Sequence, residues 1–350
     1  MYKKDIKSMN LEEISGEIEI LGYRRFHARQ IFSWLAKGAL TFDEMTDLSF
    51  ELRLILKEKY KIFDAKIIQS FCSKNDSTVK YLLSLEDGEK IESVAMKYHH
   101  GYTACISSQA GCKMNCSFCA TGKGGFSRNL TSSEMVSQLQ TMAADMKIRF
   151  SNVVMMGMGE PLDNYENTLK FLEIVTSERG MNIGKRHVSI STCGLADKIY
   201  DLAIRKLRLT LSVSLHAPND KIRSKILKIN EVFPLDYLLK ACETYALSAR
   251  RRVTFVYAMI DGVNDSSDCA RQLSKKICHI PCHVNLIPLN EIEGGEFKRS
   301  RSERTMKFCK VLMERGISVT TRRSLGGDIN ASCGQLRFRN NLRARDGLRQ

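Results

Sequence analysis

Three cysteines in the stretch "GCKMNCSFCATGKGG" carry the most specific chemical signal in the chain. Cys112, Cys116 and Cys119 form a C-x3-C-x2-C pattern, and no fourth cysteine follows closely. A structural zinc site takes four protein ligands, and nothing nearby supplies the fourth. Three unrelated buried cysteines do not explain such a dense group. Three thiolates suit a four-iron cluster better, because one iron then stays open to bind a substrate.

The charge of the chain indicates a polyanionic partner. Lysine and arginine number 54 against 39 acidic residues, which gives a net charge of +15 and a pI near 9.3. An excess of this size is typical of proteins that bind nucleic acid. The arginine-rich end of the chain, residues 339–350, is expected to form a basic tail that lies on phosphates.

The composition also excludes some classes of protein. Apolar residues make up 43% of 350, which is enough for a large core. The first ten residues lack the apolar segment of an export signal, and no apolar run approaches the ~18 residues of a membrane span. Twelve cysteines in such a chain suggest reduced thiols rather than a disulfide framework. We therefore expect a cytoplasmic protein with no membrane partner, and a monomer.

Alternating strands and helices must position the cysteines. Seven β-rich runs follow residue 103, and helical stretches such as 132–146 and 165–178 lie between them. The runs are "TACISS", "SNVVMMG", "HVSIST", "LTLSVSLH", "RRVTFVYAMI", "HVNLIPLN" and "ISVTTRRS". Strand–helix alternation predicts a parallel sheet of the α/β class. Since a closed eight-fold barrel needs more strands, we predict a partial, six-stranded β/α barrel over residues 103–338.

Two smaller units precede the barrel. Apolar residues recur at helical intervals after residue 10, with a break at Gly22, so residues 1–75 are predicted to form a small helical domain. This domain is either an RNA-binding module or a cap on the core. Residues 76–102 alternate like a β-hairpin that turns at "EDGE".

The cysteine pattern resembles that of the radical S-adenosylmethionine (SAM) superfamily. Phe118 before the last cysteine and "MGMGEP" after the second strand also fit that superfamily. The stretches "GMGEPLDNYENTL", "SVSLHAPND", "DGVND" and "GGDINASCGQLR" narrow the resemblance to the RlmN/Cfr family of RNA adenine methyltransferases. The similarity spans residues 20–338, and "GEPLDN" is closer to the RlmN branch.

The resemblance implies a set of catalytic residues. Cys333 would be the methyl-carrying cysteine, Cys105 the resolving cysteine, and Glu92 the proton acceptor. Judged without the resemblance, Cys105 is better explained as a core cysteine and Glu92 as an exposed strand residue. Cys112, Cys116 and Cys119 would hold a [4Fe–4S] cluster. The implied SAM contacts are Gly159, Glu160, Ser191, Ser214, Leu215, His216 and Asn290, with His216 alternatively a structural histidine.

The resemblance also implies a reaction. The family methylates carbon 2 or carbon 8 of adenine with two SAM molecules per turnover, through an S-methylcysteine and a 5′-deoxyadenosyl radical. For the RlmN branch the product is 2-methyladenosine in 23S rRNA near the peptidyl transferase centre, and in tRNA just 3′ of the anticodon. A disulfide between Cys105 and Cys333 would release the product, and flavodoxin or ferredoxin would supply electrons.

Three other interpretations stay open on the sequence alone. The first is a Cfr-type enzyme that methylates carbon 8 and confers antibiotic resistance. The second is a radical SAM activase of another protein, and the third is a non-catalytic RNA-binding protein with a structural cluster. A zinc site at "CHIPCH", residues 278–283, is not favoured, because the stretch continues into a strand whose side chains alternate between faces.

Overall fold

One ten-stranded sheet organises most of the chain in the computed structural model, which describes residues 3–292, 294–322 and 325–336. Its strands are β3 (Lys66–Cys72), β4 (Val79–Ser84), β5 (Lys90–Tyr98), β6 (Gly101–Cys105), β9 (Phe150–Met155), β10 (Val188–Thr192), β11 (Thr210–Ser214), β12 (Val253–Met259), β13 (Cys282–Pro288) and β14 (Val319–Thr321). Their order across the sheet is β14-β13-β12-β11-β10-β9-β6-β5-β4-β3. From β6 to β14 neighbouring strands run parallel, whereas β3 to β6 join in antiparallel pairs.

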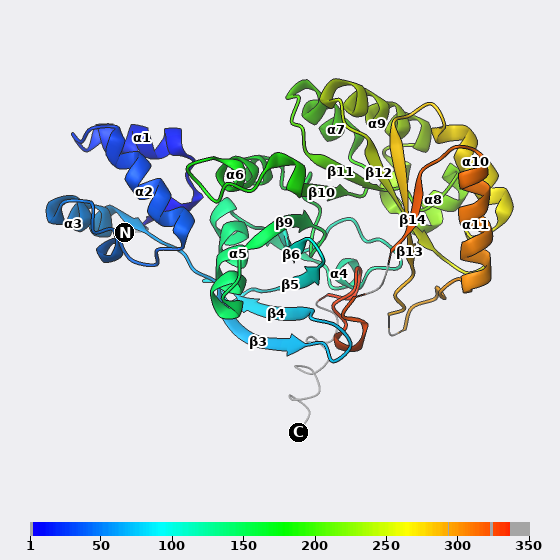
Figure 1. The fold of residues 1–350 in the computed structure, drawn as a ribbon, viewed down its shortest axis with the longest axis horizontal. Helices are drawn as coiled ribbons and strands as arrows, with labels where there is room; N and C mark the ends of the chain where they lie inside the picture. Colours follow the sequence, from blue (N-terminus) through cyan, green and yellow to red (C-terminus); the bar gives the residue numbers. More distant parts are fainter. Residues whose placement is uncertain (1–2, 293, 323–324, 337–350) are drawn as a thin grey trace.

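Helices connect the parallel strands and pack around the sheet (Figure 1). They are α5 (Ser132–Met146), α6 (Tyr165–Thr176), α7 (Ala196–Ile204), α8 (Asp220–Ile226), α9 (Leu235–Ala249), α10 (Ser267–Ile277) and α11 (Ser302–Glu314). Polar caps set where they begin: Thr131 and Glu134 form a capping box at α5, and Ser266 accepts a hydrogen bond from Cys269 N at α10. Apolar and polar residues alternate along β10, and their burial alternates in the same way, so one face of this strand packs into the core.

The predicted partial β/α barrel is confirmed. Each of the seven predicted β-rich runs forms a strand, and the predicted helix over 132–146 matches α5. The described residues contain seven parallel strands, β6 and β9 to β14, rather than six, because the short β14 adds to the edge of β13. Strand β5 occupies the free edge of β6, so the sheet does not close on itself.

Three helices precede the sheet, as the periodicity predicts. They are α1 (Leu11–Ile20), α2 (Phe26–Lys37) and α3 (Phe50–Lys59), and the chain turns between the first two at Gly22, whose φ is +82°. Strand β1 (Lys4–Asp5) pairs with β2 (Tyr60–Lys61) and closes this unit. The buried Lys7 Nζ donates to Ser137 Oγ on α5 at 3.2 Å, which attaches the helices to the barrel.

The predicted hairpin is also confirmed, and the structure extends it. Strands β4 and β5 pair in antiparallel register, and the turn holds Gly88 at a φ of +85°. Strand β3, which lies within the range predicted as a helical domain, adds a third strand beside β4. Most of β3 is exposed, so its residues do not show the alternation that marks a half-buried strand. The sequence boundary at residue 75 therefore lies inside this antiparallel part of the sheet.

Two further predictions concern the basic tail and the absence of a membrane span. The basic tail, residues 339–350, lies outside the described residues. Within the described part of the chain, no helix is both long and apolar enough to cross a membrane.

Candidate active site

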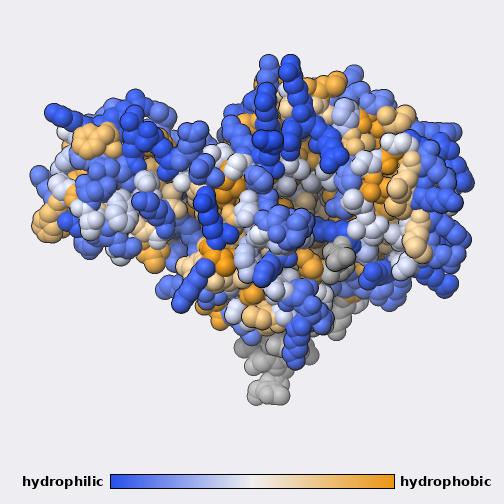
Figure 2. Space-filling model, in the orientation of Figure 1, coloured by the Kyte–Doolittle hydropathy of each residue, from blue (hydrophilic) through white to orange (hydrophobic). Residues whose placement is uncertain are grey.

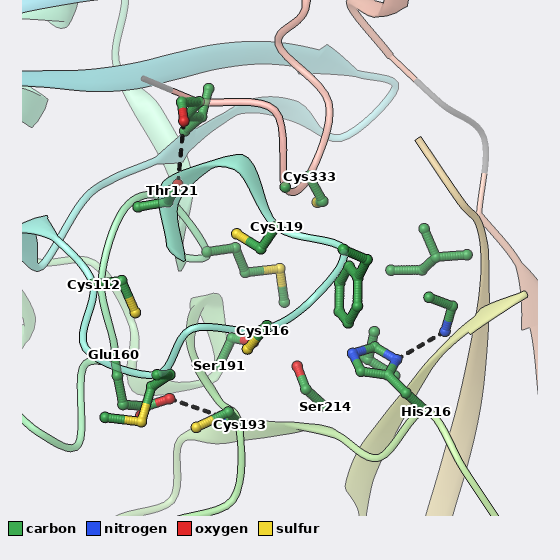
Figure 3. Close-up of a pocket in the computed structure, with 18 of the residues that line it drawn as sticks. Cys112, Cys116, Cys119, Thr121, Glu160, Ser191, Cys193, Ser214, His216 and Cys333 are labelled. Carbon is green, nitrogen blue, oxygen red and sulfur yellow. Dashed lines mark hydrogen bonds between the residues drawn. The ribbon is translucent and has the colours of Figure 1, made fainter. Parts of the chain in front are cut away.

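The three cysteines lie on a compact loop that follows the first parallel strand. Strands β7 (Gln109–Gly111) and β8 (Phe126–Asn129) pair at its base, and the short helix α4 (Ala120–Lys123) lies within it. Cys112 N donates to Gly125 O at 2.9 Å, and Cys119 N donates to Cys116 O at 3.1 Å. These bonds turn all three thiols toward one cavity of about 160 Å³ (Figure 3).

The donor set fits an iron–sulfur cluster better than a single ion. Among the residues that the structure describes, no three His, Cys, Asp or Glu side chains converge as they would around one metal ion. Burial raises the pKa of Cys112 to about 12 and that of Cys116 well above the ordinary thiol value. Bound iron offsets this cost, because a coordinated thiol is deprotonated. Cys112, Cys116 and Cys119 would therefore hold three irons and leave the fourth open.

Glycines at the end of β9 let the backbone form the next wall of the cavity. A Cβ atom on Gly157 would lie 2.6 Å from Ile106 O, and one on Gly159 would lie 2.5 Å from Gln109 Cβ. Gly159 also has a φ of +98°, which disfavours any other residue. Close approach to the segment after β6 thus explains the glycines of "MGMGEP".

Glu160 joins two strand ends from within the same wall. Its buried carboxylate accepts a hydrogen bond from Leu162 N at 3.0 Å and another from Cys193 N at 2.7 Å. Burial raises the pKa of Glu160, and the two backbone donors act in the opposite direction. The carboxylate therefore fixes the end of β9 against the end of β10. Cys193, to which the sequence analysis gave no role, also lines the cavity.

Polar side chains from the following strands complete the wall. Ser191, Ser214, His216 and Asn290 line the cavity together with Gly159 and Glu160, as predicted for SAM contacts. They lie at or just beyond the carboxyl ends of β10, β11 and β13, where β/α barrels place their sites. Leu215 differs: its side chain is 0% exposed in the hydrophobic core, and only its backbone approaches this region.

His216 is held rigidly and carries no charge. Its Nδ1 accepts a hydrogen bond from Ala258 N at 2.9 Å, and its ring meets the ring of Phe118 edge-on at 4.9 Å. Burial lowers the pKa of His216 to about 3. The imidazole is therefore neutral, with its proton on Nε2. Its φ of +54° is uncommon for a residue other than glycine, and the surrounding contacts stabilise it.

The loop that carries Cys333 closes over the cysteine loop. Ala120 N donates to Gly334 O at 2.7 Å, and Thr121 Oγ1 donates to Leu336 O at 3.3 Å. Asn290 Nδ2 adds a bond of 3.2 Å to the carbonyl of Cys333 itself. Cys333 therefore lines the same cavity as the three cluster cysteines, although it lies far from them in sequence (Figure 3).

Cys333 also borders a second, smaller cavity that contains Cys105. This cavity of about 30 Å³ is lined by Cys105, Cys333, Arg322 and Met156, among others. Burial raises the pKa of Cys105 to about 12, and the neighbouring Cys333 adds to the shift. The two predicted thiols thus meet at one place in the fold.

Glu92 lies on the same face of the sheet as Cys105. Val94 of β5 is directly opposite Cys105 of β6, and Glu92 is two residues from Val94, so its side chain points to the same side. Glu92 is 4% exposed and pairs with Lys80 Nζ at 3.4 Å, so the interpretation as an exposed strand residue is wrong.

Sequence analysis did not identify the arginine that joins the ends of β10 and β11. Arg223 on α8 is 0% exposed, and its Nη2 donates to Cys193 O at 2.6 Å and to Ser214 O at 3.3 Å. An arginine on a short basic helix would be expected at the surface, so no sequence signal marks it.

In the stretch "CHIPCH", the ring of His283 makes hydrogen-bond contacts within the protein. His283 contacts Ser318 Oγ through Nδ1 and Thr320 Oγ1 through Nε2, each at 2.9 Å. Both ring nitrogens are therefore occupied by hydroxyl groups. These contacts agree with the sequence argument against a metal site there.

A three-cysteine loop after the first strand of a partial β/α barrel, facing a cavity at the strand ends, defines a radical SAM enzyme. The Radical SAM superfamily model matches residues 106–271, and the model of the Ribosomal RNA large subunit methyltransferase N-terminal domain matches residues 4–62. The chain is thus similar to one superfamily over the barrel and to one family over the N-terminal helices.

Full-length relatives narrow the class further. A probable dual-specificity RNA methyltransferase RlmN from a Thermoanaerobacter species is 47% identical over 95% of this chain and 97% of its own. A protein of the same name from Lachnoclostridium phytofermentans is 46% identical over 96% and 94%. The crystal structure of a radical SAM methyltransferase from Sphaerobacter thermophilus superposes with a TM-score of 0.90, at 41% identity, over 96% and 99% of the two chains. The chain belongs to the RlmN family of radical SAM RNA methyltransferases, enzymes that use a [4Fe–4S] cluster and SAM.

Removal of any one cluster thiol is expected to abolish the cluster. Cys116→Ala leaves too few thiolates to hold three irons, so anaerobic reconstitution should yield neither the visible absorbance of a cluster nor stoichiometric iron. Cys278→Ala, which removes an exposed thiol elsewhere, is the matched control. Normal iron content in Cys116→Ala would contradict the ligand assignment.

Glu160→Gln is expected to loosen the cavity wall. An amide has one acceptor oxygen, so one of the two backbone N–H groups, of Leu162 or Cys193, loses its partner inside the protein. The free energy of unfolding should fall by about 1–3 kcal/mol, and SAM affinity should fall with it. Denaturant unfolding and SAM titration measure the two effects, with the exposed Glu178→Gln as control. Unchanged values in both would show that the carboxylate is not needed there.

Proposed function

We propose that this protein methylates carbon 2 of adenosine in 23S rRNA at the peptidyl transferase centre and in tRNA at the position 3′ of the anticodon. The observation that carries the proposal is the meeting of Cys333 and Cys105 beside the cluster loop. The relatives named dual-specificity RNA methyltransferases, and the N-terminal match to a ribosomal RNA methyltransferase domain, support RNA as the substrate.

The target atom explains why a radical enzyme is needed. Carbon 2 of adenine is an electrophilic ring carbon, so it does not attack the methyl group of SAM as a ring nitrogen does. When bound, the cluster and SAM supply a 5′-deoxyadenosyl radical next to the cavity wall. The chain must then supply a methyl carrier, a proton acceptor and a means of release.

Cys333 is the proposed carrier. Its thiolate attacks the methyl carbon of a first SAM, the carbon–sulfur bond of the sulfonium breaks, and a thioether forms on Cys333. A hydrogen atom is then removed from this methyl group with the help of a second SAM, and the methylene radical adds to the base. The adduct radical would return one electron to the cluster, which balances the electron that cleaves the second SAM. Because Cys333 borders the cavity of the cluster cysteines, this hydrogen is in reach of the radical.

Glu92 and Cys105 are the proposed residues of release. Glu92, which forms an ion pair with Lys80, takes the proton from the carbon of the base. The thiolate of Cys105 then attacks the sulfur of Cys333, a disulfide forms, and the electron pair of the broken carbon–sulfur bond passes to the product. A thiol reductant of the cell must reopen the disulfide.

The surface suits a polyanionic substrate. The net charge is +15, and hydrophilic side chains cover most of the face shown in Figure 2. The helices α1 to α3 stand to one side of the barrel in Figure 1, where they extend the surface that an RNA can contact. We propose that the helices within residues 1–75 form an RNA-binding accessory domain, that residues 76–102 form a hairpin linker to which β3 is added, and that residues 103–338 form the catalytic core. A cytoplasmic monomer reduced by flavodoxin or ferredoxin completes the proposal.

Two alternatives differ in what they require. A Cfr-type enzyme uses the same residues and differs only in presenting carbon 8 instead of carbon 2. A radical SAM activase of another protein needs no methyl carrier, so it would leave the paired Cys105 and Cys333 without a purpose. The thiol pair therefore favours a methyltransferase over an activase.

The ring position is tested with deuterated SAM. Reconstituted enzyme, a reductant, SAM with a CD3 group and unmodified 23S rRNA or tRNA are incubated without oxygen, and the digested nucleosides are analysed by liquid chromatography and mass spectrometry. We expect 2-methyladenosine that keeps two of the three deuterium atoms, because one is removed to form the radical. An 8-methyladenosine product would contradict carbon 2, and SAM cleavage without any methyladenosine would contradict RNA methylation.

Cys105→Ala is expected to trap the RNA on the protein. Without the attacking thiolate the carbon–sulfur bond to Cys333 persists, so a covalent complex should accumulate and resist denaturing electrophoresis. Product formation should fall at least ~100-fold, the scale on which loss of a reacting group acts. Cys242→Ala, which removes another buried thiol, is the control. Normal turnover by Cys105→Ala would contradict the release step.

A further inference from the structure

One guanidinium, that of Arg322, contacts Cys333 and lines the small cavity that Cys333 shares with Cys105. Arg322 follows β14, and its backbone N donates to Leu286 O of β13 at 2.8 Å, which fixes the root of the side chain. Its Nη1 lies 3.7 Å from Cys333 Sγ and 3.7 Å from Met156 Sδ. Arg322 also lines the small cavity with Cys105.

The charge of this arginine is not neutralised by a carboxylate. Among the ion pairs between described residues, none includes Arg322, and Glu92 is paired with Lys80. On its other side Arg322 borders a cavity of about 220 Å³, which it shares with Tyr98, His100, Arg186 and His187. These side chains are positive or neutral, so they do not balance the positive charge of Arg322. The negative charge best placed to balance it is a thiolate of Cys333 or Cys105.

The electrostatics agree with the geometry. The pKa of Arg322 is raised above its ordinary value, chiefly by the nearby Cys333, next by Tyr98, and with a smaller contribution from Cys105, whereas burial acts in the opposite direction. Arg322 in turn lowers the pKa of Cys105, although burial raises it by more. An arginine stays protonated at any physiological pH, so it acts here as a permanent cation.

We propose that Arg322 is a further catalytic residue, which stabilises the thiolate of Cys333 during methyl transfer and then the thiolate of Cys105 during release. The inference rests on the proposed function, because it assigns a role within the carrier route. Its basis is the position of one permanent cation beside both sulfur atoms.

Each step keeps its balance of atoms and electrons. The thiol proton of Cys333 leaves to solvent before transfer, and the thiolate forms a bond to the methyl carbon as the sulfonium bond breaks. The products are a neutral thioether and neutral S-adenosylhomocysteine, so the Cys333 sulfur no longer offsets the cation. Arg322 is then free to stabilise the thiolate of Cys105, which is needed next.

The first test measures the transfer of a CD3 group from SAM to Cys333 in the reconstituted holoenzyme without RNA, by peptide mass spectrometry from pH 6 to 10. Loss of the cation should make the thiolate of Cys333 less stable, so methyl transfer in Arg322→Gln should be roughly 10–100-fold slower at pH 7, and the deficit should shrink as the pH rises. Arg322→Lys keeps the charge and should recover part of the rate. Arg315→Gln, an exposed arginine near the same strand, is the matched control and should behave as wild type.

A second measurement separates this inference from the proposed function. Iodoacetamide alkylation of Cys333 over the same pH range, in an enzyme never exposed to SAM, reports the thiolate without any methyl transfer. A profile in Arg322→Gln that matches wild type, or a loss of rate that is equal at every pH, would overturn the role of Arg322. A shifted alkylation profile together with no methylation of wild-type Cys333 would uphold the thiolate effect and contradict the carrier route.

Discussion

The active site depends on how two loops from opposite ends of the catalytic core are held together. Backbone and threonine bonds join Ala120 to Gly334 and Thr121 to Leu336, and these bonds place Cys333 against the cluster loop. In the proposed mechanism a methyl group on that sulfur must lie within reach of a radical, and a misplacement of about 1 Å is enough to cost a large part of a rate. Hydrogen bonds between main chains give this accuracy, because they leave few torsions free.

Burial makes the thiolate forms of the cysteines costly, and neighbouring cations offset that cost. A thiolate is costly in a low-dielectric cavity, which is why the pKa values of Cys105 and Cys112 rise to about 12. Iron would supply the positive charge for the cluster cysteines, and Arg322 is the proposed cation for Cys333 and Cys105, whose shared cavity it lines. Lys80 does the same for Glu92. Each reactive anion of the proposed mechanism therefore has its own nearby cation.

The parts predicted well from sequence are those in which local pattern decides structure. Strand–helix alternation predicted the barrel, and the turn at Gly88 predicted the hairpin. Both predictions are possible because spacing and turn chemistry act over a few residues. The cluster cysteines were recognisable from spacing alone. The pairing of Cys105 with Cys333 required the family resemblance, since nothing local brings these positions together. Leu215 was placed on the cavity by the same resemblance, but alternation along the strand end directs its side chain into the core.

Arg322 shows why some functional residues cannot be predicted from the sequence alone. It follows the exposed Thr320 and Thr321, where a surface arginine would be the ordinary expectation. Only the fold reveals that Arg322 lines two cavities, one with Cys105 and Cys333 and one with Tyr98, His100 and His187. Cys333 likewise lines two cavities, that of the cluster cysteines and that of Cys105. In the proposed mechanism one sulfur therefore accepts a methyl group from the side of the cluster cavity and forms a disulfide on the side of Cys105.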